Sequence, residues 1–254
     1  WAGPGFHMVH YPLRHGALFN IVAVFRRSAH SERGDAAAYR AELEHTYRDI
    51  DFISGHSYYQ ERNGDRGSFL ASAVDMDAFI EAVVATADSV KAALRSERTI
   101  DISFDEWNVW YSDRFNESGK ITDVNTWPYA PRLLEDQYSV TDAVVVGSLL
   151  ICLLKHADRV KVACLAQLVN VIAPIMTEPG GPAWRQTIFF PFAITARLAQ
   201  GTVLRLAVES PSYDTAEYGS VPLVDAVATI DDNSGAVAVF LVNRSQDAAT
   251  TVSI

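Results

Sequence analysis

The fold is decided by residues 51–104, which read DFISGHSYYQERNGDRGSFLASAVDMDAFIEAVVATADSVKAALRSERTIDISF. The two ends of this stretch, 51–56 and 99–104, are short and rich in apolar residues, as strands are. Between them, apolar residues recur every three or four positions, which is typical of a helix packed on one side. They are Met76, Phe79, Ile80, Val83, Val84, Ala87 and Val90. The stretch therefore predicts a strand, a helix whose N-terminus is capped by Asp75, and a second strand.

The same alternation of strand and helix continues to Gly201. Ser139-Val140-Thr141-Asp142 resembles a capped helix start, and the apolar run up to Leu154 supplies the helix body. Residues 160–165 predict a third strand, and residues 184–200 predict a third helix that Gly201 closes. Repeated strand–helix units imply parallel strands with helices outside them, as in a (β/α)8 TIM barrel.

Beyond Gly201 the sequence predicts strands only, because short alternating runs are separated by turn residues. The runs are 203–206, 224–230 and 236–242. A complete barrel takes roughly 250 residues, so we expect a partial one. The predicted fold is α/β: residues 38–201 form the C-terminal part of a TIM barrel, and 202–254 begin an all-β sandwich.

The first 37 residues have a different pattern. Residues 6–11 and 18–25 alternate like the arms of a β-hairpin, and Arg14-His15-Gly16 between them suits a turn. Residues 26–35 are polar and aperiodic, which indicates a boundary. Positions in strands and turns account for the histidines of this part without a metal ion. These histidines are His7, His10, His15 and His30.

Composition limits the classes of partner. The formal net charge is -10 and no basic patch offsets it, so neither nucleic acid nor an anionic membrane surface is an expected partner. The longest apolar run, from Ala143 to Leu154, is shorter than the roughly 20 residues that cross a bilayer. No signal peptide is recognisable, which favours a cytoplasmic protein. We expect Cys152 and Cys164 to be buried free thiols.

Chemistry is expected where parallel strands end, since catalytic groups of such barrels project from the C-terminal strand ends. This rule selects three segments, 56–59, 105–111 and 166–170. In the middle one, strand alternation is expected to send Asp105 and Glu106 to opposite sides, so that one of them faces the barrel mouth. A carboxylate beside aromatic rings suits a sugar site. Composition alone favours the simpler interpretation, an acidic loop beside surface aromatic residues.

The middle segment, Ser103-Phe104-Asp105-Glu106-Trp107-Asn108-Val109-Trp110-Tyr111, resembles the nucleophile segment of family 51 glycoside hydrolases, the α-L-arabinofuranosidases. The resemblance continues through residues 133–136, 153–161 and 164–175, and extends from about Glu42 to the C-terminus. It implies a retaining enzyme that releases terminal non-reducing α-L-arabinofuranosyl residues from arabinose-containing oligosaccharides. The resemblance implies no cofactor and no metal. It implies a possible homo-oligomer, which in the family is a hexamer.

The resemblance also assigns roles to individual residues. Glu106 matches the nucleophile, Tyr58 the tyrosine that orients it, and Trp110 and Gln167 residues that line the arabinose subsite. Without the resemblance, Tyr58 could equally be a packed aromatic residue, and Gln167 would be interpreted as an ordinary polar residue at a strand end. His56 could support the residues that touch the substrate or be a histidine of the core, and we favour the core interpretation.

Retaining glycosidases also need an acid/base carboxyl group about 5 Å from the nucleophile. The resemblance implies that this glutamate is absent from the chain, and we reject Asn116-Glu117 because it lies in a polar loop. Residues 1–37 resemble part of the substrate domain of flavin-dependent monooxygenases of the salicylate hydroxylase type. The chain is therefore also compatible with an inactive fragment or chimera that binds sugars weakly, and remotely with an FAD-dependent aromatic hydroxylase.

Overall fold

The structure is a computed structural model that describes residues 2–3, 6–13, 18–25, 36–115, 117, 121, 123, 129 and 131–254. The chain divides into two compact units, Trp1–His45 and Thr46–Ile254. Each unit is described by itself below.

The first unit contains a three-stranded antiparallel sheet, with β1 (Ala2–Gly3), β2 (Phe6–Leu13) and β3 (Leu18–Phe25) in that order. β2 and β3 pair along their whole length, from Phe6 opposite Phe25 to Leu13 opposite Leu18. Helix α1 (Ala36–Thr46) follows and ends at the start of the second unit. The predicted turn at Arg14-His15-Gly16 and the histidines His15 and His30 lie outside the described residues.

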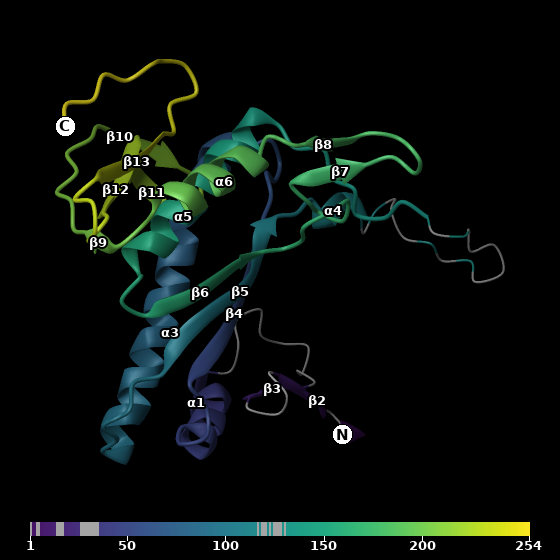
Figure 1. Cartoon of the computed structure of the whole chain (residues 1–254), viewed down its shortest axis with the longest axis vertical. Coiled ribbons are helices and arrows are strands. Elements are labelled where there is room, and N and C mark those ends of the chain that lie inside the picture. The colour runs from purple at the N-terminus through teal and green to yellow at the C-terminus, as the bar shows by residue number, and fades with distance from the viewer. Residues whose placement is uncertain are drawn as a thin grey trace. The chain divides into compact units, whose positions relative to one another are not determined.

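The second unit is organised around a parallel sheet in the order β4 (Phe52–Tyr59), β5 (Asp101–Val109), β6 (Val160–Leu165). Helix α3 (Ala73–Leu94) connects β4 to β5, and α5 (Val140–Lys155) connects β5 to β6. Both helices lie beside the sheet in Figure 1. Their apolar sides and one face of the sheet form a common core, which includes Met76, Ile80, Ile102, Phe104, Trp107, Val145 and Leu149. The α/β class predicted from the sequence is confirmed.

Two predicted helix starts had different outcomes. The start of α5 is confirmed: Ser139 is the N-cap, and its side chain and that of Asp142 form a reciprocal capping box. The prediction for α3 is wrong by one turn. Its N-cap is Ser72, and Asp75 lies in the first turn, where its carboxylate accepts a hydrogen bond of 3.2 Å from the Tyr59 hydroxyl. The short helix α2 (Arg66–Leu70) ends at its C-cap Ala71, directly before the N-cap of α3.

The helix predicted at 184–200 is also wrong at its beginning. Residues 183–185 form β8 (Ala183–Arg185), which pairs antiparallel with β7 (Ile175–Thr177), and α6 spans only Phe189–Leu198. Apolar residues near 184 fit a strand as well as a helix, so their period does not separate the two. The pairing of Met176 with Trp184 decides in favour of the strand.

The C-terminal part contains only strands. β9 (Thr202–Leu204), β12 (Val224–Ile230) and β13 (Val237–Asn243) form one antiparallel sheet, and β10 (Ser212–Thr215) pairs with β11 (Gly219–Pro222). Gly201 begins this part with φ of +73°, and a Cβ there would overlap the carbonyl oxygen of Ile230. Glycine is therefore required for the chain to leave α6 and enter β9.

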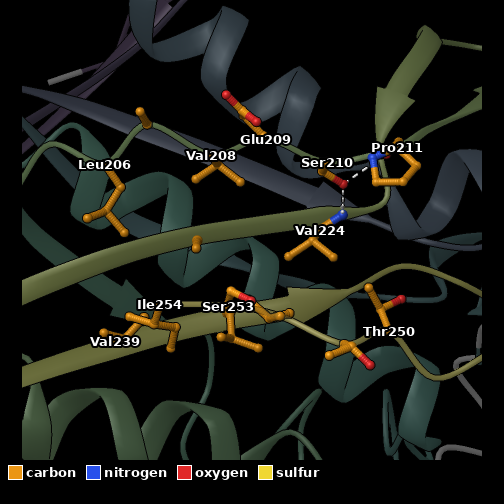
Figure 2. A pocket seen from close by; sticks show the side chains of 15 residues that line it. Leu206, Val208, Glu209, Ser210, Pro211, Val224, Val239, Thr250, Ser253 and Ile254 are labelled. Carbon is orange, nitrogen blue, oxygen red and sulfur yellow. Dashed lines mark hydrogen bonds between the residues drawn. The ribbon is translucent and has the colours of Figure 1, made fainter.

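The hairpin β10–β11 is attached to the α/β part through two hydrogen bonds to α2. The Tyr213 hydroxyl donates to the Gly67 carbonyl at 2.9 Å, and the Glu217 amide donates to the Ser68 hydroxyl at 3.2 Å. A separate hollow of about 580 Å³ lies over β12 and β13, and Ser210 at its edge accepts a hydrogen bond from the Val224 amide (Figure 2). Its lining includes none of the four predicted site residues.

The two cysteines differ in exposure. Cys152 is buried in α5, as predicted, whereas Cys164 is exposed, so that part of the prediction is wrong. Cys164 lies on β6, an edge strand of the described sheet, and the residues from Lys161 to Cys164 are all exposed. Within the described ranges, no helix combines the length and the apolar character that crossing a membrane requires.

Candidate active site

The site is built where β4 and β5 end. These strands are parallel neighbours, and their register places His56 opposite Glu106 and Tyr58 opposite Asn108. The carboxyl ends of the two strands therefore carry their side chains to one edge of the sheet. There the Tyr58 hydroxyl donates a hydrogen bond of 2.6 Å to Oε1 of Glu106.

Tyr58 stays a hydrogen-bond donor over a wide pH range. Burial and the bond to Glu106 raise the pKa of Tyr58 well above its usual value, because both disfavour a phenolate. The ring of Trp110 packs edge-on against the Tyr58 ring, with 5.2 Å between centroids and an angle of 74°. The structure thus brings Glu106, Tyr58 and Trp110 together.

Gln167 lies one strand further along the sheet, in the exposed loop that follows β6. Asn108 fixes the backbone around this loop. Its fully buried side chain donates to the carbonyl oxygens of Ala166 and Ile172, the latter at 2.6 Å. The strand that carries Glu106 therefore also anchors, through Asn108, the loop that carries Gln167.

Asp105 and Glu106 lie on the same side of the sheet, so the prediction that they face opposite sides is wrong. Both carboxylates approach the same imidazole: Nε2 of His56 lies 3.1 Å from Oδ1 of Asp105, and Nδ1 lies 3.6 Å from Oε2 of Glu106. The physical reason is an irregular register on both sides of β5, between Ser54 and His56 on β4 and between Phe104 and Trp107 on β5. An irregularity of this kind breaks strict alternation and re-aims a side chain.

His56 is not a core histidine, and that interpretation is wrong. Its side chain is 51% exposed and lies between the two carboxylates. One signal in the sequence could have placed it. His56 and Tyr58 are two residues apart on one strand, so their side chains share a face. Because the resemblance places Tyr58 beside Glu106, His56 is expected on the same side. Residue Asn116 of the rejected Asn116-Glu117 pair lies outside the described residues.

We expect Tyr58→Phe to slow the reaction of Glu106 with an activated substrate by roughly 10- to 100-fold, since the carboxylate loses the donor that orients it. The rate of covalent adduct formation, followed by intact-protein mass, measures this. Tyr129→Phe is the matched control because Tyr129 is fully exposed. Equal rates for both variants and the unmodified chain would contradict an orienting role for Tyr58.

One cluster of possible metal ligands occurs among the described residues, formed by Asp77, Cys152 and His156. Two of its groups are already paired with each other, and the third is a buried thiol. Nε2 of His156 forms a 2.6 Å hydrogen bond with Oδ1 of Asp77, and burial raises the pKa of the Cys152 thiol, which keeps it protonated. The pair joins the C-terminal end of α5 to the first part of α3. The cluster is therefore a helix-to-helix contact.

This contact predicts a pH-dependent stability. The hydrogen bond to Asp77 raises the pKa of His156 above its usual 6.5, and the same bond lowers the pKa of Asp77. A histidine whose pKa is higher in the folded state stabilises the fold at pH values below its unfolded-state pKa. This stabilisation is lost as the pH rises through the folded-state pKa. We expect His156→Gln to destabilise by up to about 1 kcal/mol near pH 5.5 and by less near pH 9. Urea unfolding at both values, with the exposed His45→Gln as control, measures the difference. An equal loss at both values would contradict it.

The chain is similar in sequence to known proteins of one family. A profile of the α-L-arabinofuranosidase C-terminal domain matches residues 105–254. An intracellular exo-α-(1→5)-L-arabinofuranosidase of Streptomyces lividans is 58% identical over 212 residues, which is 84% of this chain and 31% of that protein. An exo-α-(1→6)-L-arabinofuranosidase of Bifidobacterium longum is 54% identical over 218 residues, covering 84% of this chain and 41% of that protein.

A solved structure of the same family is also similar to this chain. That of a family 51 α-L-arabinofuranosidase from Bifidobacterium longum superposes with a TM-score of 0.78 at 44% identity, over 88% of this chain and 44% of that chain. The chain thus spans less than half the length of each of these relatives. The resemblance to family 51 is confirmed. Because the profile covers more than half of the sequence and includes Glu106, the chain belongs to the α-L-arabinofuranosidase C-terminal domain family.

Proposed function

We propose that this chain carries the nucleophile of a retaining glycoside hydrolase that releases terminal non-reducing α-L-arabinofuranosyl residues. One observation carries the proposal: the 2.6 Å hydrogen bond from Tyr58 to Glu106 at the carboxyl ends of adjacent parallel strands. That bond occupies Oε1 and restricts rotation of the carboxylate, as a nucleophile in a displacement requires. The names of the curated relatives supply the sugar.

In the proposed reaction, a carboxylate oxygen of Glu106 bonds to the anomeric carbon while the glycosidic bond breaks. The aryl or sugar oxygen leaves with the bonding electrons. We assign Trp110 and Gln167 to the walls of the arabinose subsite, and the acid/base glutamate to a region outside this chain. No cofactor takes part in this scheme.

The architecture that would hold this site is part of the proposal. The parallel order β4-β5-β6 and the intervening helices α3 and α5 support the last three βα units of a TIM barrel over residues 38–201. The strands after Gly201 support the start of a β-sandwich over 202–254. Homo-oligomer formation, as a hexamer, and a cytoplasmic location complete the proposal; light scattering after size exclusion tests the assembly.

The substrate is proposed as an arabinofuranosyl oligosaccharide. The two curated relatives carry names with different linkages, α-(1→5) and α-(1→6), while the terminal arabinofuranosyl group is common to both. We accordingly expect Trp110 and Gln167 to recognise the terminal arabinofuranosyl group whichever linkage the substrate has.

The test is intact-protein mass after incubation of this chain with a dinitrophenyl α-L-arabinofuranoside. A good leaving group needs little protonation, so the nucleophile can react without its acid partner. We expect one added pentosyl unit, and peptide mapping should place it on Glu106. No adduct, or an adduct on another residue, would favour the alternative of an inactive fragment or chimera with at most weak sugar binding.

The alternative of a flavin-dependent hydroxylase rests on residues 1–37 and has a test of its own. The resemblance of this part to a flavin-dependent aromatic hydroxylase concerns its sequence only, and the described strands β1 to β3 form a sheet without the strand–helix turn of a dinucleotide site. We therefore expect the chain to show no flavin absorbance after reconstitution with FAD. Bound flavin would support the hydroxylase alternative.

A further inference from the structure

The imidazole of His56 lies between two carboxylates that follow each other in the sequence. Its Nε2 is 3.1 Å from Oδ1 of Asp105, and its Nδ1 is 3.6 Å from Oε2 of Glu106. The ring is half exposed, so it borders the open side of the site and is not fixed by apolar packing. What holds it must therefore be polar contacts.

The hydrogen bonds around Asp105 determine which atom carries a proton. Ser54 donates its hydroxyl hydrogen to Oδ1 of Asp105 at 2.7 Å, and Ser103 donates to Oδ2 at 3.1 Å. The Ser54 oxygen also lies 3.1 Å from Nε2 of His56. Because the single hydrogen of Ser54 is directed to Asp105, both neighbours of Nε2 can only accept. Nε2 is consequently the donor, and the ring orientation is fixed.

This orientation turns Nδ1 towards the nucleophile. Glu106 is then approached from two strand positions, since Tyr58 donates to Oε1 while His56 faces Oε2. A distance of 3.6 Å is too long for a hydrogen bond. The approach is nevertheless close, and it places Nδ1 of His56 against Oε2 of Glu106.

We propose that His56, held by Asp105, Ser54 and Ser103, is a positioning residue that fixes the second oxygen of Glu106. This inference rests on the proposed function of Glu106. The carboxylate then has a neighbour at each oxygen, Tyr58 at Oε1 and His56 at Oε2, which limits its rotation before the substrate arrives. When Glu106 bonds to the anomeric carbon, the leaving group takes the electrons of the broken bond and the charge opposite Nδ1 disappears.

Two variants of His56 separate the two sides of the ring. The amide nitrogen of asparagine reaches the place of Nδ1, and that of glutamine the place of Nε2. We expect His56→Asn to form the covalent adduct at close to the original maximal rate, and His56→Gln to be slower on the order of 10- to 100-fold. Half-saturation by the dinitrophenyl arabinofuranoside should change little in either. His45→Gln, an exposed site in the first unit, is the control.

The opposite order of the two variants would show that His56 only supports Asp105, and equal rates for all variants would show that it has no role. Either result overturns the proposal while an adduct on Glu106 still supports the proposed function. A chain that forms no adduct contradicts the proposed function instead.

A measurement without substrate then tests His56 directly. The ring nitrogen shifts of His56, read by long-range ¹H–¹⁵N NMR, should move at Nδ1 in Glu106→Gln and at Nε2 in Asp105→Asn. An Nδ1 shift that does not respond to Glu106→Gln would overturn the inference, whether or not the chain reacts.

Discussion

Glu106→Gln should react with a dinitrophenyl α-L-arabinofuranoside at least about 10³-fold more slowly than the unmodified chain, so that no covalent adduct is detected. An amide oxygen carries no full charge and cannot replace a carboxylate as the attacking group. The substitution keeps the size of the side chain and still accepts the hydrogen bond from Tyr58. The fold should therefore be unchanged, and only the reaction should stop.

Glu178→Gln is the control for this experiment, since Glu178 is a half-exposed partner of Arg132 on the β7–β8 hairpin. It should react at the original rate. Unfolding by urea, with equal midpoints for the two variants and the unmodified chain, excludes a structural cause. An adduct that persists in Glu106→Gln would move the nucleophile to another residue and remove the central assignment.

Asn108→Leu should lower the free energy of unfolding by about 3 kcal/mol, because buried polar groups without partners cost 1–3 kcal/mol each. The side chain is fully buried, and it serves two carbonyl oxygens, of Ala166 and Ile172, and the amide of Val109. Leucine has a similar volume and removes the bonds of Asn108 to all three groups. Adduct formation should also slow, since the loop that carries Gln167 loses its anchor.

Asn108→Asp distinguishes loss of donors from loss of shape. It keeps an acceptor for Val109 but gives neither carbonyl oxygen a donor, so it should be destabilised as well. Asn233→Leu, in the exposed turn before β13, should change stability by less than about 0.5 kcal/mol. Midpoints and slopes of urea unfolding measure the differences, and a neutral Asn108→Leu would show that the loop is held by other contacts.

The sequence predicts those parts of the fold that depend on local pattern. The period of apolar residues in α3, the capping box of Ser139 and the three parallel strands were found because each is written in neighbouring residues. The errors concern residues whose state depends on distant partners. Trp184 is in a strand because Met176 pairs with it, and Cys164 is exposed because β6 lies at the edge of the described sheet.

The site shows the same division. Tyr58 and Glu106 could be paired by resemblance, whereas the side of the sheet that Asp105 takes could not be read from alternation. A register irregularity between two strands does not appear in the sequence of either one. Asn108 was missed for a related reason: its function is to hold carbonyl oxygens of a loop that begins 58 residues later.

The two hydrogen bonds between the β10–β11 hairpin and α2 bear on how such a protein can diverge. Tyr213 and Glu217 bond to Gly67 and Ser68, which precede α3 and follow the strand that carries Tyr58. Replacement of the C-terminal strands by an unrelated module would leave a carbonyl and a hydroxyl of α2 without these partners. The two regions are therefore expected to be inherited together, and insertions to be accepted in the outer turns sooner than at this junction.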